Sequence, residues 1–258
     1  MNKLKTPREI TLDDRAADEQ IRLRSRRGFL VGGLAAAAGI GGYAWLRTRG
    51  EDNSVPWPQR LVLGWNEQIA RGYLSDSRKV PTYSPSDVRF LKPNGDIGLD
   101  DDVDDDSWRV SVQVPGAAPP LALTLADVKA LPKVEMITKF CCIEGWSVVT
   151  RWAGVRFADF TRKYFPPGQQ LPNFVYMATP DEEYYVGLDS KSALHPQTLL
   201  AYEINGEPLP DEHGAPLRLV IPVKYGVKNI KRIGMIRYSD TRPTDYWYER
   251  GYDWFAGL

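Results

Sequence analysis

The chain has few residues of the kinds that build covalent cross-links and acid–base sites: its 258 residues include two cysteines and two histidines. The cysteines are the neighbours Cys141 and Cys142, and adjacent cysteines rarely reach disulfide geometry, so no structural disulfide is expected. With only His195 and His213 available as bases, the composition also disfavours a thiol enzyme. A free cysteine is most often a small buried hydrophobe, and this interpretation stays open for the pair.

The chain also lacks net charge, because 33 Lys and Arg balance 33 Asp and Glu. The balance hides two unlike parts. Residues 1–50 hold 10 basic and 5 acidic side chains, whereas residues 51–258 hold 23 basic and 28 acidic ones. A mildly acidic second part without a basic stripe argues against a nucleic acid as partner.

Long apolar runs are absent except near the N-terminus, where Val31–Leu46 follows Arg26 and Arg27. Paired arginines before a short Gly/Ala-rich stretch are typical of a twin-arginine export signal, which carries proteins that have already folded. The pattern predicts a protein that is periplasmic or at the outer face of the inner membrane. The uncharged stretch from Gly28 is near the lower limit for spanning a bilayer, so a cleaved leader and a retained membrane anchor both remain open.

The rest of the chain divides by composition. After the signal or anchor (residues 1–50), the Pro- and Trp-punctuated segment 51–79 predicts an arm or linker, and 80–258 predicts one globular domain without internal repeats. Short strands, few helices and many Gly/Pro turns indicate a β-rich α+β fold of mixed sheets. Strands are expected at 108–114, 134–140, 174–179, 217–222 and 230–238, and short helices at 125–131 and from 155.

A dense acidic run, Asp100–Asp106, stands out in the first third of this domain. It lacks the glycine and terminal glutamate spacing of an EF-hand calcium loop. A solvated loop is the favoured interpretation, and a docking patch for a basic partner is the alternative.

The surroundings of Cys142 carry the strongest chemical signal. Lys139 precedes it by three positions, Glu144-Gly145-Trp146-Ser147 follows, and Trp152-Ala153-Gly154-Val155 comes a little later. A thiolate is a soft ligand that suits a transition metal. This segment resembles the molybdenum-ligand segment of the sulfite oxidase family, in which one cysteine binds the metal of a molybdopterin cofactor.

A second segment supplies positive charge. Five cations and no acid lie between Lys224 and Arg237, which favours an anionic ligand, although a solvated basic face would show the same composition. Gly214–Pro222 and the following Lys-Tyr-Gly and Asn-Ile-Lys turns resemble the pterin-binding stretch of the catalytic subunits of bacterial periplasmic methionine-sulfoxide reductases. The two resemblances together extend from about Tyr83 to the C-terminus.

The resemblance implies a set of site residues. Cys142 would be the molybdenum ligand, with Lys139 near the metal where the family has an arginine. The expected contacts to a molybdenum–molybdopterin cofactor are Leu91, Lys92, Thr179, His213, Arg218, Asn229, Ile230 and Lys231. The sequence departs from the family at His213, where the reductases have asparagine, and at Leu91-Lys92, where they have Tyr-Glu. His195 precedes a proline and is expected to be structural, and Cys141 is expected to face away from the metal.

The resemblance further implies a molybdenum oxidoreductase that transfers an oxygen atom or reduces a small, sulfoxide-type substrate. Because the chain has no haem attachment pair, its electrons are expected to come from or go to another protein. The resemblance implies a membrane-bound b-type cytochrome as this partner. The chain ends before the C-terminal dimerisation domain of full sulfite oxidases, so a monomeric catalytic domain is expected. The aromatic tail 246–255 either docks the partner or packs over the domain. A non-catalytic envelope module that binds another anion is the alternative function.

Overall fold

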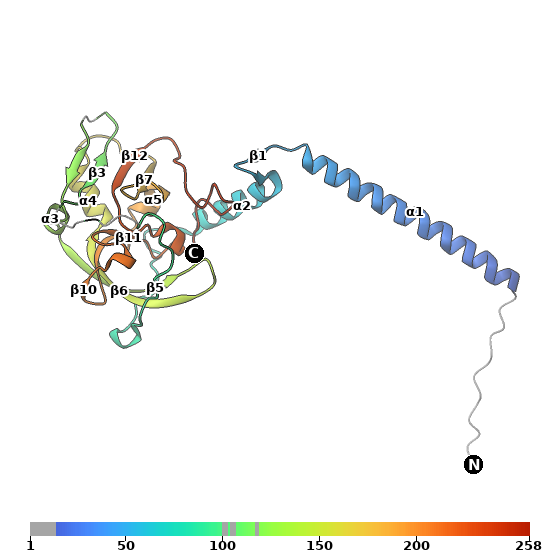
Figure 1. The fold of residues 1–258 in the computed structure, drawn as a ribbon, viewed down its shortest axis with the longest axis horizontal. Coiled ribbons are helices and arrows are strands. Elements are labelled where there is room, and N and C mark those ends of the chain that lie inside the picture. Colours follow the sequence, from blue (N-terminus) through green and yellow to red (C-terminus); the bar gives the residue numbers. More distant parts are fainter. Residues whose placement is uncertain (1–13, 100–102, 104–106, 117–118) are drawn as a thin grey trace, which may run out of the picture. The chain divides into compact units, whose positions relative to one another are not determined.

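The computed structural model describes residues 14–99, 103, 107–116 and 119–258 (Figure 1). The chain divides into two compact units, Met1–Glu51 and Asp52–Leu258. Apart from Val103, the acidic run 100–106 lies outside the described residues.

The first unit is dominated by one long helix, α1 (Asp14–Arg47). Its stretch Ile21–Arg47 is long and apolar enough to cross a membrane, a criterion that a signal sequence also meets. Every side chain of that stretch is exposed. An apolar helix at this place fits both the leader and the anchor that the sequence left open.

The second unit holds the remaining elements. Its helices are α2 (Trp57–Tyr73), α3 (Leu125–Lys129), α4 (Phe157–Tyr164) and α5 (Ser190–Ala193), with 3-10 turns at Pro85–Asp87, Asp211–His213 and Gly226–Lys228. The strands, counted from the unit boundary, are β1 (Glu51–Asp52), β2 (Val55–Pro56), β3 (Val110–Gln113), β4 (Leu121–Leu123), β5 (Lys133–Cys141), β6 (Ser147–Arg156), β7 (Phe174–Ala178), β8 (Tyr185–Asp189), β9 (Leu199–Ile204), β10 (Glu207–Pro208), β11 (Arg218–Val220) and β12 (Met235–Ser239).

Two five-stranded sheets organise this unit. One has the order β10-β9-β6-β5 with β11 also paired to β9, and the other has the order β4-β3-β12-β7-β8. All these pairings are antiparallel except that of β12 with β3. The β5–β6 hairpin forms the long curved ribbon in Figure 1. Mixed sheets with short helices confirm the predicted α+β, β-rich class.

The main core lies between the sheets and takes aliphatic and aromatic side chains from both of them and from α4. A smaller cluster around Trp152 and Leu199 fills the other side of the first sheet. Within the first sheet, strands β6 and β9 approach closely where their register shifts, and a Cβ at Gly154 would lie 2.0 Å from the carbonyl oxygen of Leu200. Only glycine fits there.

The last strand starts later than the sequence pattern predicts. Strand β12 begins at Met235 rather than at Ile230, because Arg232 adopts a positive φ of 45°. The backbone N–H of Arg232 donates to Gly214, and that of Ile233 donates to Leu217, so this stretch pairs with the loop before β11 instead of with a sheet neighbour.

The segment expected as an arm or linker contains α2, which contacts the rest of the second unit. Glu67 is 8% exposed and pairs with Arg71 on the same helix and with Arg242 near the C-terminus. Further along, the Gln197 side chain donates to and accepts from the backbone of Val80, and His195 contacts the Arg78 carbonyl oxygen, which matches the structural role expected for it.

Replacing Glu67 with Gln should lower the free energy of unfolding by about 1–3 kcal/mol, because two arginines would lose a shared buried carboxylate. Chemical denaturation of the purified protein measures the change. The control is Arg162→Gln, which breaks the exposed Arg162–Asp159 pair and should cost less than about 0.5 kcal/mol. Equal effects of the two substitutions would contradict a supporting role for Glu67.

Candidate active site

Strand β5 ends at a tight turn that presents Cys142. The Cys142 N–H donates to the carbonyl of Trp146, the Gly145 N–H donates back to Cys142, and Gly145 takes a φ of +91° that suits glycine. Cys142 is 7% exposed, and its Sγ lies 3.7 Å from the amide nitrogen of Asn94. The sulfur is therefore held on a rigid hairpin rather than on a mobile loop.

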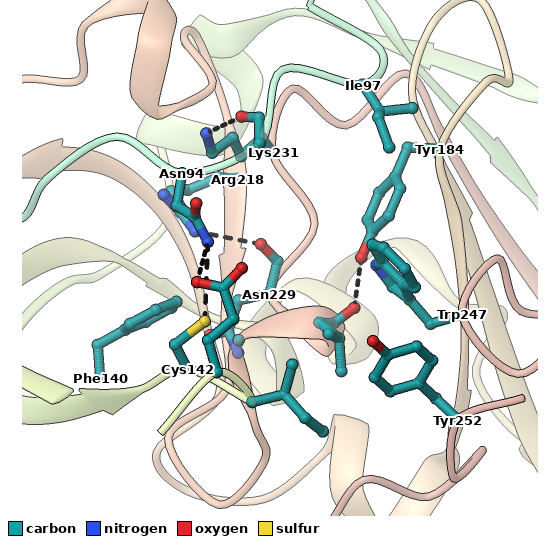
Figure 2. Close-up of a pocket in the computed structure, with 15 residues that line it drawn as sticks. Asn94, Ile97, Phe140, Cys142, Tyr184, Arg218, Asn229, Lys231, Trp247 and Tyr252 are labelled. Carbon is teal, nitrogen blue, oxygen red and sulfur yellow. Dashed lines mark hydrogen bonds between the residues drawn. The ribbon is translucent and has the colours of Figure 1, made fainter. Parts of the chain in front are cut away.

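The Cys142 side chain lines a cavity of about 170 Å³ that several distant segments enclose (Figure 2). Its other lining residues are Asn94, Gly95, Ile97, Phe140, Ile143, Glu144, Tyr184, Arg218, Gly226, Val227, Asn229, Lys231, Trp247 and Tyr252. Figure 2 shows Cys142 and Asn94 on one side and the aromatic rings of Tyr184, Trp247 and Tyr252 on the other. Cys141 is half-buried and is not among the lining residues.

Burial raises the pKa of the Cys142 thiol. A nucleophilic cysteine needs the opposite shift, usually from a neighbouring cation or imidazole. Neither His195 nor His213 lines the cavity, so the site offers no imidazole base to this thiol. The geometry disfavours a thiol enzyme, whereas a metal could still bind the deprotonated sulfur.

Arg218 brings a buried positive charge to the cavity. Its guanidinium donates to the carbonyl oxygens of His213 and Asn229 at 3.0 and 3.1 Å and lies 4.8 Å from the centre of the Trp152 ring. Burial lowers its pKa to about 10. Within the part of the chain that the structure describes, Arg218 has no carboxylate partner.

Lys231 adds a second, half-buried cation to the cavity. Its ammonium group donates to the carbonyl oxygens of Gly95 and Glu212 at 2.6 and 2.8 Å, and it forms no ion pair among the described residues. Burial, followed by repulsion from Arg218, lowers its pKa to about 8. Neither cation has an ion-pair partner among the described residues, and the Glu144 carboxylate in the same lining accepts hydrogen bonds from Asn94 and Trp146 instead. The cavity therefore favours an anionic occupant.

The turn after β11 shapes the floor of the site. The Asn229 side chain accepts from the Ile221 N–H at 2.8 Å and donates to the Tyr225 carbonyl at 3.1 Å, so it fixes this turn. A Cβ at Gly226 would lie 2.7 Å from the Phe140 ring, which keeps the turn against the cysteine hairpin. Ile230 is fully buried behind the turn, and its carbonyl accepts from Leu219.

The structure thus brings Cys142, Arg218, Asn229 and Lys231 together, whereas other expected residues lie outside the cavity lining. Leu91 is buried in the smaller core, and Lys92 is exposed. The Lys139 ammonium lies 5.6 Å from the Tyr83 ring centre, and its charge lowers the pKa of Cys141 against the larger effect of burial. Thr179 bonds Asp181 and the backbone of Tyr184 in the β7–β8 turn.

His213 is 4% exposed and contributes its carbonyl oxygen to the Arg218 guanidinium. The pKa of its imidazole is lowered to about 4, mainly by burial and then by Arg218 and Lys231. An unfolded histidine titrates near 6.5, so the folded protein holds this ring neutral over a range in which the unfolded chain takes up a proton.

This shift predicts a pH-dependent stability. Above pH 6.5 the His213 contribution is fully present, and it is lost as the pH falls from 6.5 towards 4. From about pH 7.5 to pH 5 the loss should be about 2 kcal/mol. Urea unfolding of cofactor-free protein at both pH values measures it. The His213→Gln variant should lose about 2 kcal/mol less than the wild type over the same range, and identical losses would contradict the assignment.

Several lining residues were not predicted from the sequence. Glu144 belongs to the cysteine motif and accepts hydrogen bonds from Asn94 and Trp146 at 3.4 and 3.0 Å, so the motif itself carried a signal for it. Trp247 and Tyr252 lie in the aromatic tail, whose composition was the only indication. Asn94 and Tyr184 have no local signal.

The chemistry of these donors fits a molybdopterin cofactor. The lining offers a soft sulfur ligand, one buried and one half-buried cation without carboxylate partners, and backbone carbonyls and N–H groups close by. A thiolate suits the metal, and the cations and polar backbone groups suit an anionic, hydrogen-bonding pterin phosphate. Cys142, Arg218, Asn229 and Lys231 are therefore the residues that could hold it.

Comparison with known proteins agrees with this chemistry. The family described as oxidoreductase molybdopterin binding domain matches residues 97–247. A relative from Azospira oryzae, named for a protein-methionine-sulfoxide reductase subunit (YedZ1), is 32% identical over 245 residues that cover 92% of this chain and 89% of the relative. The protein-methionine-sulfoxide reductase catalytic subunit MsrP of Xanthomonas campestris is 37% identical over 154 residues.

The MsrP match covers 54% of this chain and 48% of the relative, so the chain spans about half the length of that protein. Among solved structures, the sulfane dehydrogenase SoxCD from Paracoccus pantotrophus aligns with a TM-score of 0.49 at 18% identity, over 55% of this chain and 40% of that one. The family match extends over more than half of the chain and includes the cysteine hairpin and the basic turn. The chain belongs to the sulfite oxidase-like family of molybdopterin-binding oxidoreductases.

Proposed function

We propose that this oxidoreductase reduces a small sulfoxide to the sulfide, with two electrons and two protons consumed and one water released. The observation that carries the proposal is the cavity in which Cys142 faces Arg218 and Lys231, two cations without carboxylate partners among the described residues. The names of the relatives, which refer to protein-methionine-sulfoxide reductases, supply the substrate class.

In this proposal Cys142 binds the molybdenum, and Arg218, Asn229 and Lys231 hold the pterin and its phosphate. When bound, the cofactor, in its molybdenum–molybdopterin form, supplies the redox centre that takes up the sulfoxide oxygen. His213, Ile230 and Leu91 support this site from behind, because His213 and Ile230 lie next to Arg218 and the turn, and Leu91 packs in the adjoining core. Direct contacts from Lys92, Lys139 and Thr179 remain predictions of the family resemblance.

We further propose export by the twin-arginine route to the periplasmic face of the inner membrane. The Arg26-Arg27 pair before an apolar helix supports the route, and the stretch Ile21–Arg47 supports retention as an anchor. A membrane-bound b-type cytochrome is the proposed electron donor, since the relative that the chain matches over most of its length is named as a subunit of an assembly. The tether would keep the catalytic unit close to such a donor.

Steady-state turnover tests the proposal. The exported full-length protein, with its molybdenum content measured, is assayed with methionine sulfoxide and a reduced dye, and in parallel with sulfite and an oxidised dye. Sulfoxide reduction with a molybdenum-containing protein is the expected result. Sulfite oxidation as the faster reaction would overturn the proposed direction, and protein that folds without molybdenum would overturn the cofactor assignment.

A further inference from the structure

The most unusual surface of the catalytic unit lies on α2. Its outward side carries the apolar series Trp57, Leu61, Trp65, Ile69 and Tyr73, spaced four residues apart, with Val62 beside it. Trp65, Ile69 and Tyr73 are each more than 60% exposed. Side chains four positions apart are neighbours on a helix surface, so together they form an apolar stripe that winds obliquely along the outward side of α2.

The charges of α2 lie on its opposite face. All three of its charged residues, Arg60, Glu67 and Arg71, point towards the rest of the unit. Arg60 pairs with Asp52, and Glu67 pairs with Arg71 and Arg242. The outward side therefore carries no charge at all. A helix on a water-facing surface shows the reverse distribution, with apolar residues inward and charges outward.

The composition of this stripe indicates which kind of surface it contacts. Tryptophan and tyrosine are enriched where a bilayer meets water, because each has an apolar ring and a polar tip. Arg78 and Lys79 follow the helix at the surface, with the Arg78 guanidinium 4.9 Å from the Tyr73 ring centre, so cations border the stripe as they do on interfacial helices. Only nine residues separate the start of α2 at Trp57 from Arg47, where the apolar stretch of α1 ends.

We propose that α2 is an interfacial helix, which inserts its apolar stripe into the lipid headgroup region of the membrane that α1 spans. This inference rests on the proposed anchoring of α1 for the presence of the bilayer. Nine extended residues reach at most about 30 Å, so the tether confines α2 to the neighbourhood of the membrane surface. Contact of the stripe with the membrane would then fix the orientation of the catalytic unit relative to the bilayer.

The inward face of α2 contacts the segment that forms one wall of the active-site cavity. The Arg60 guanidinium lies 3.8 Å from the Tyr248 ring centre, and the Gln59 amide donates to the Gly251 carbonyl. Trp247 and Tyr252, which directly flank these two contacts in the sequence, line the cavity. Membrane contact on one face of α2 would therefore orient the cavity wall that its other face braces.

A protease site inserted between Gly50 and Glu51 separates the two membrane attachments. The full-length, cofactor-loaded protein is reconstituted into vesicles of phosphatidylethanolamine and phosphatidylglycerol, cut, and separated by flotation. The test variant is Trp65→Ser with Ile69→Ser, and the control is Phe90→Ser with Leu121→Ser, which removes two exposed apolar side chains outside α2. Turnover with a soluble dye, measured in parallel, tests the proposed function separately.

After cleavage the wild-type unit should float with the vesicles, whereas the test variant should show a partition coefficient lower by about tenfold or more. The control should change by less than about twofold. Full release of the wild-type unit would overturn the proposal, as would equal release of test and control variants. Retention only on vesicles that contain a membrane protein would assign the stripe to that protein and overturn the proposal. A soluble dimer that shields Trp65 would assign it to a second copy of the chain and would also overturn the proposal.

Discussion

The Cys142→Ser protein should contain less than about a tenth of the wild-type molybdenum and should lose turnover by a factor on the order of 10³ or more. The hydroxyl of serine is a harder and weaker ligand than a thiolate, and the cavity offers no second thiol to replace it. Metal analysis of the exported, folded protein, together with steady-state sulfoxide reduction, measures both effects. The fold should persist, because serine differs from cysteine by one atom.

The neighbouring cysteine provides the matched control. Cys141 differs from Cys142 by one position, is half-buried, and does not line the cavity. Cys141→Ser should therefore retain its molybdenum and more than about half of the turnover. Full molybdenum in Cys142→Ser, or equal losses in both variants, would contradict the assignment of the metal to Cys142.

The local parts of this site were predictable because their signals are contiguous in the sequence. Alternation along 134–140 predicts the strand, and β5 extends over Lys133–Cys141. A strand end is a rigid support, and Cys142 stands in the turn directly after it. Lys231 lies in the run of cations without acids from Lys224 to Arg237, which indicated an anionic ligand, and Arg218 was expected from the family resemblance.

The remainder of the site depends on packing between distant segments. Asn94 and Cys142 are separated by 48 positions, yet the amide nitrogen lies 3.7 Å from the sulfur. Such a contact follows from how loops cross the sheets, and a lone asparagine carries no pattern that reveals it. For Thr179 the strand was predicted correctly, but the bonds of its hydroxyl depend on the β7–β8 turn, whose geometry the strand pattern does not specify.

The role of α2 was hidden for a different physical reason. The segment 51–79 shows an apolar pattern that would normally be taken as the buried face of a helix. Here Trp65 is 61% exposed and Glu67 is 8% exposed, so the helix is turned with its charged side inward. Periodicity identifies two faces but cannot tell which one meets the protein, because a membrane and a protein core select the same residues.

Replacing Arg218 with Met should lower cofactor retention by about 10- to 100-fold while changing the stability of the cofactor-free protein much less. In the cofactor-free protein, Arg218 is a buried charge without a carboxylate partner among the described residues, and the cost of its burial offsets its hydrogen bonds to His213 and Asn229. With an anionic pterin present, the same charge would gain its counter-ion. Arg218 therefore contributes to stability mostly in the cofactor-loaded protein.

The measurement is the difference between the unfolding free energies of loaded and cofactor-free protein, together with molybdenum content. For Arg218→Met this difference should shrink by about 1.5–3 kcal/mol, the range of a hydrogen bond to a charged group. Arg232→Met is the control. Arg232 is equally buried and donates to the Ala215 carbonyl, but it pairs with Asp211 and does not line the Cys142 cavity, so both of its states should be destabilised alike. If Arg218→Met also lowered both states equally, its charge would serve the fold, and the anion that balances it would have to be sought elsewhere.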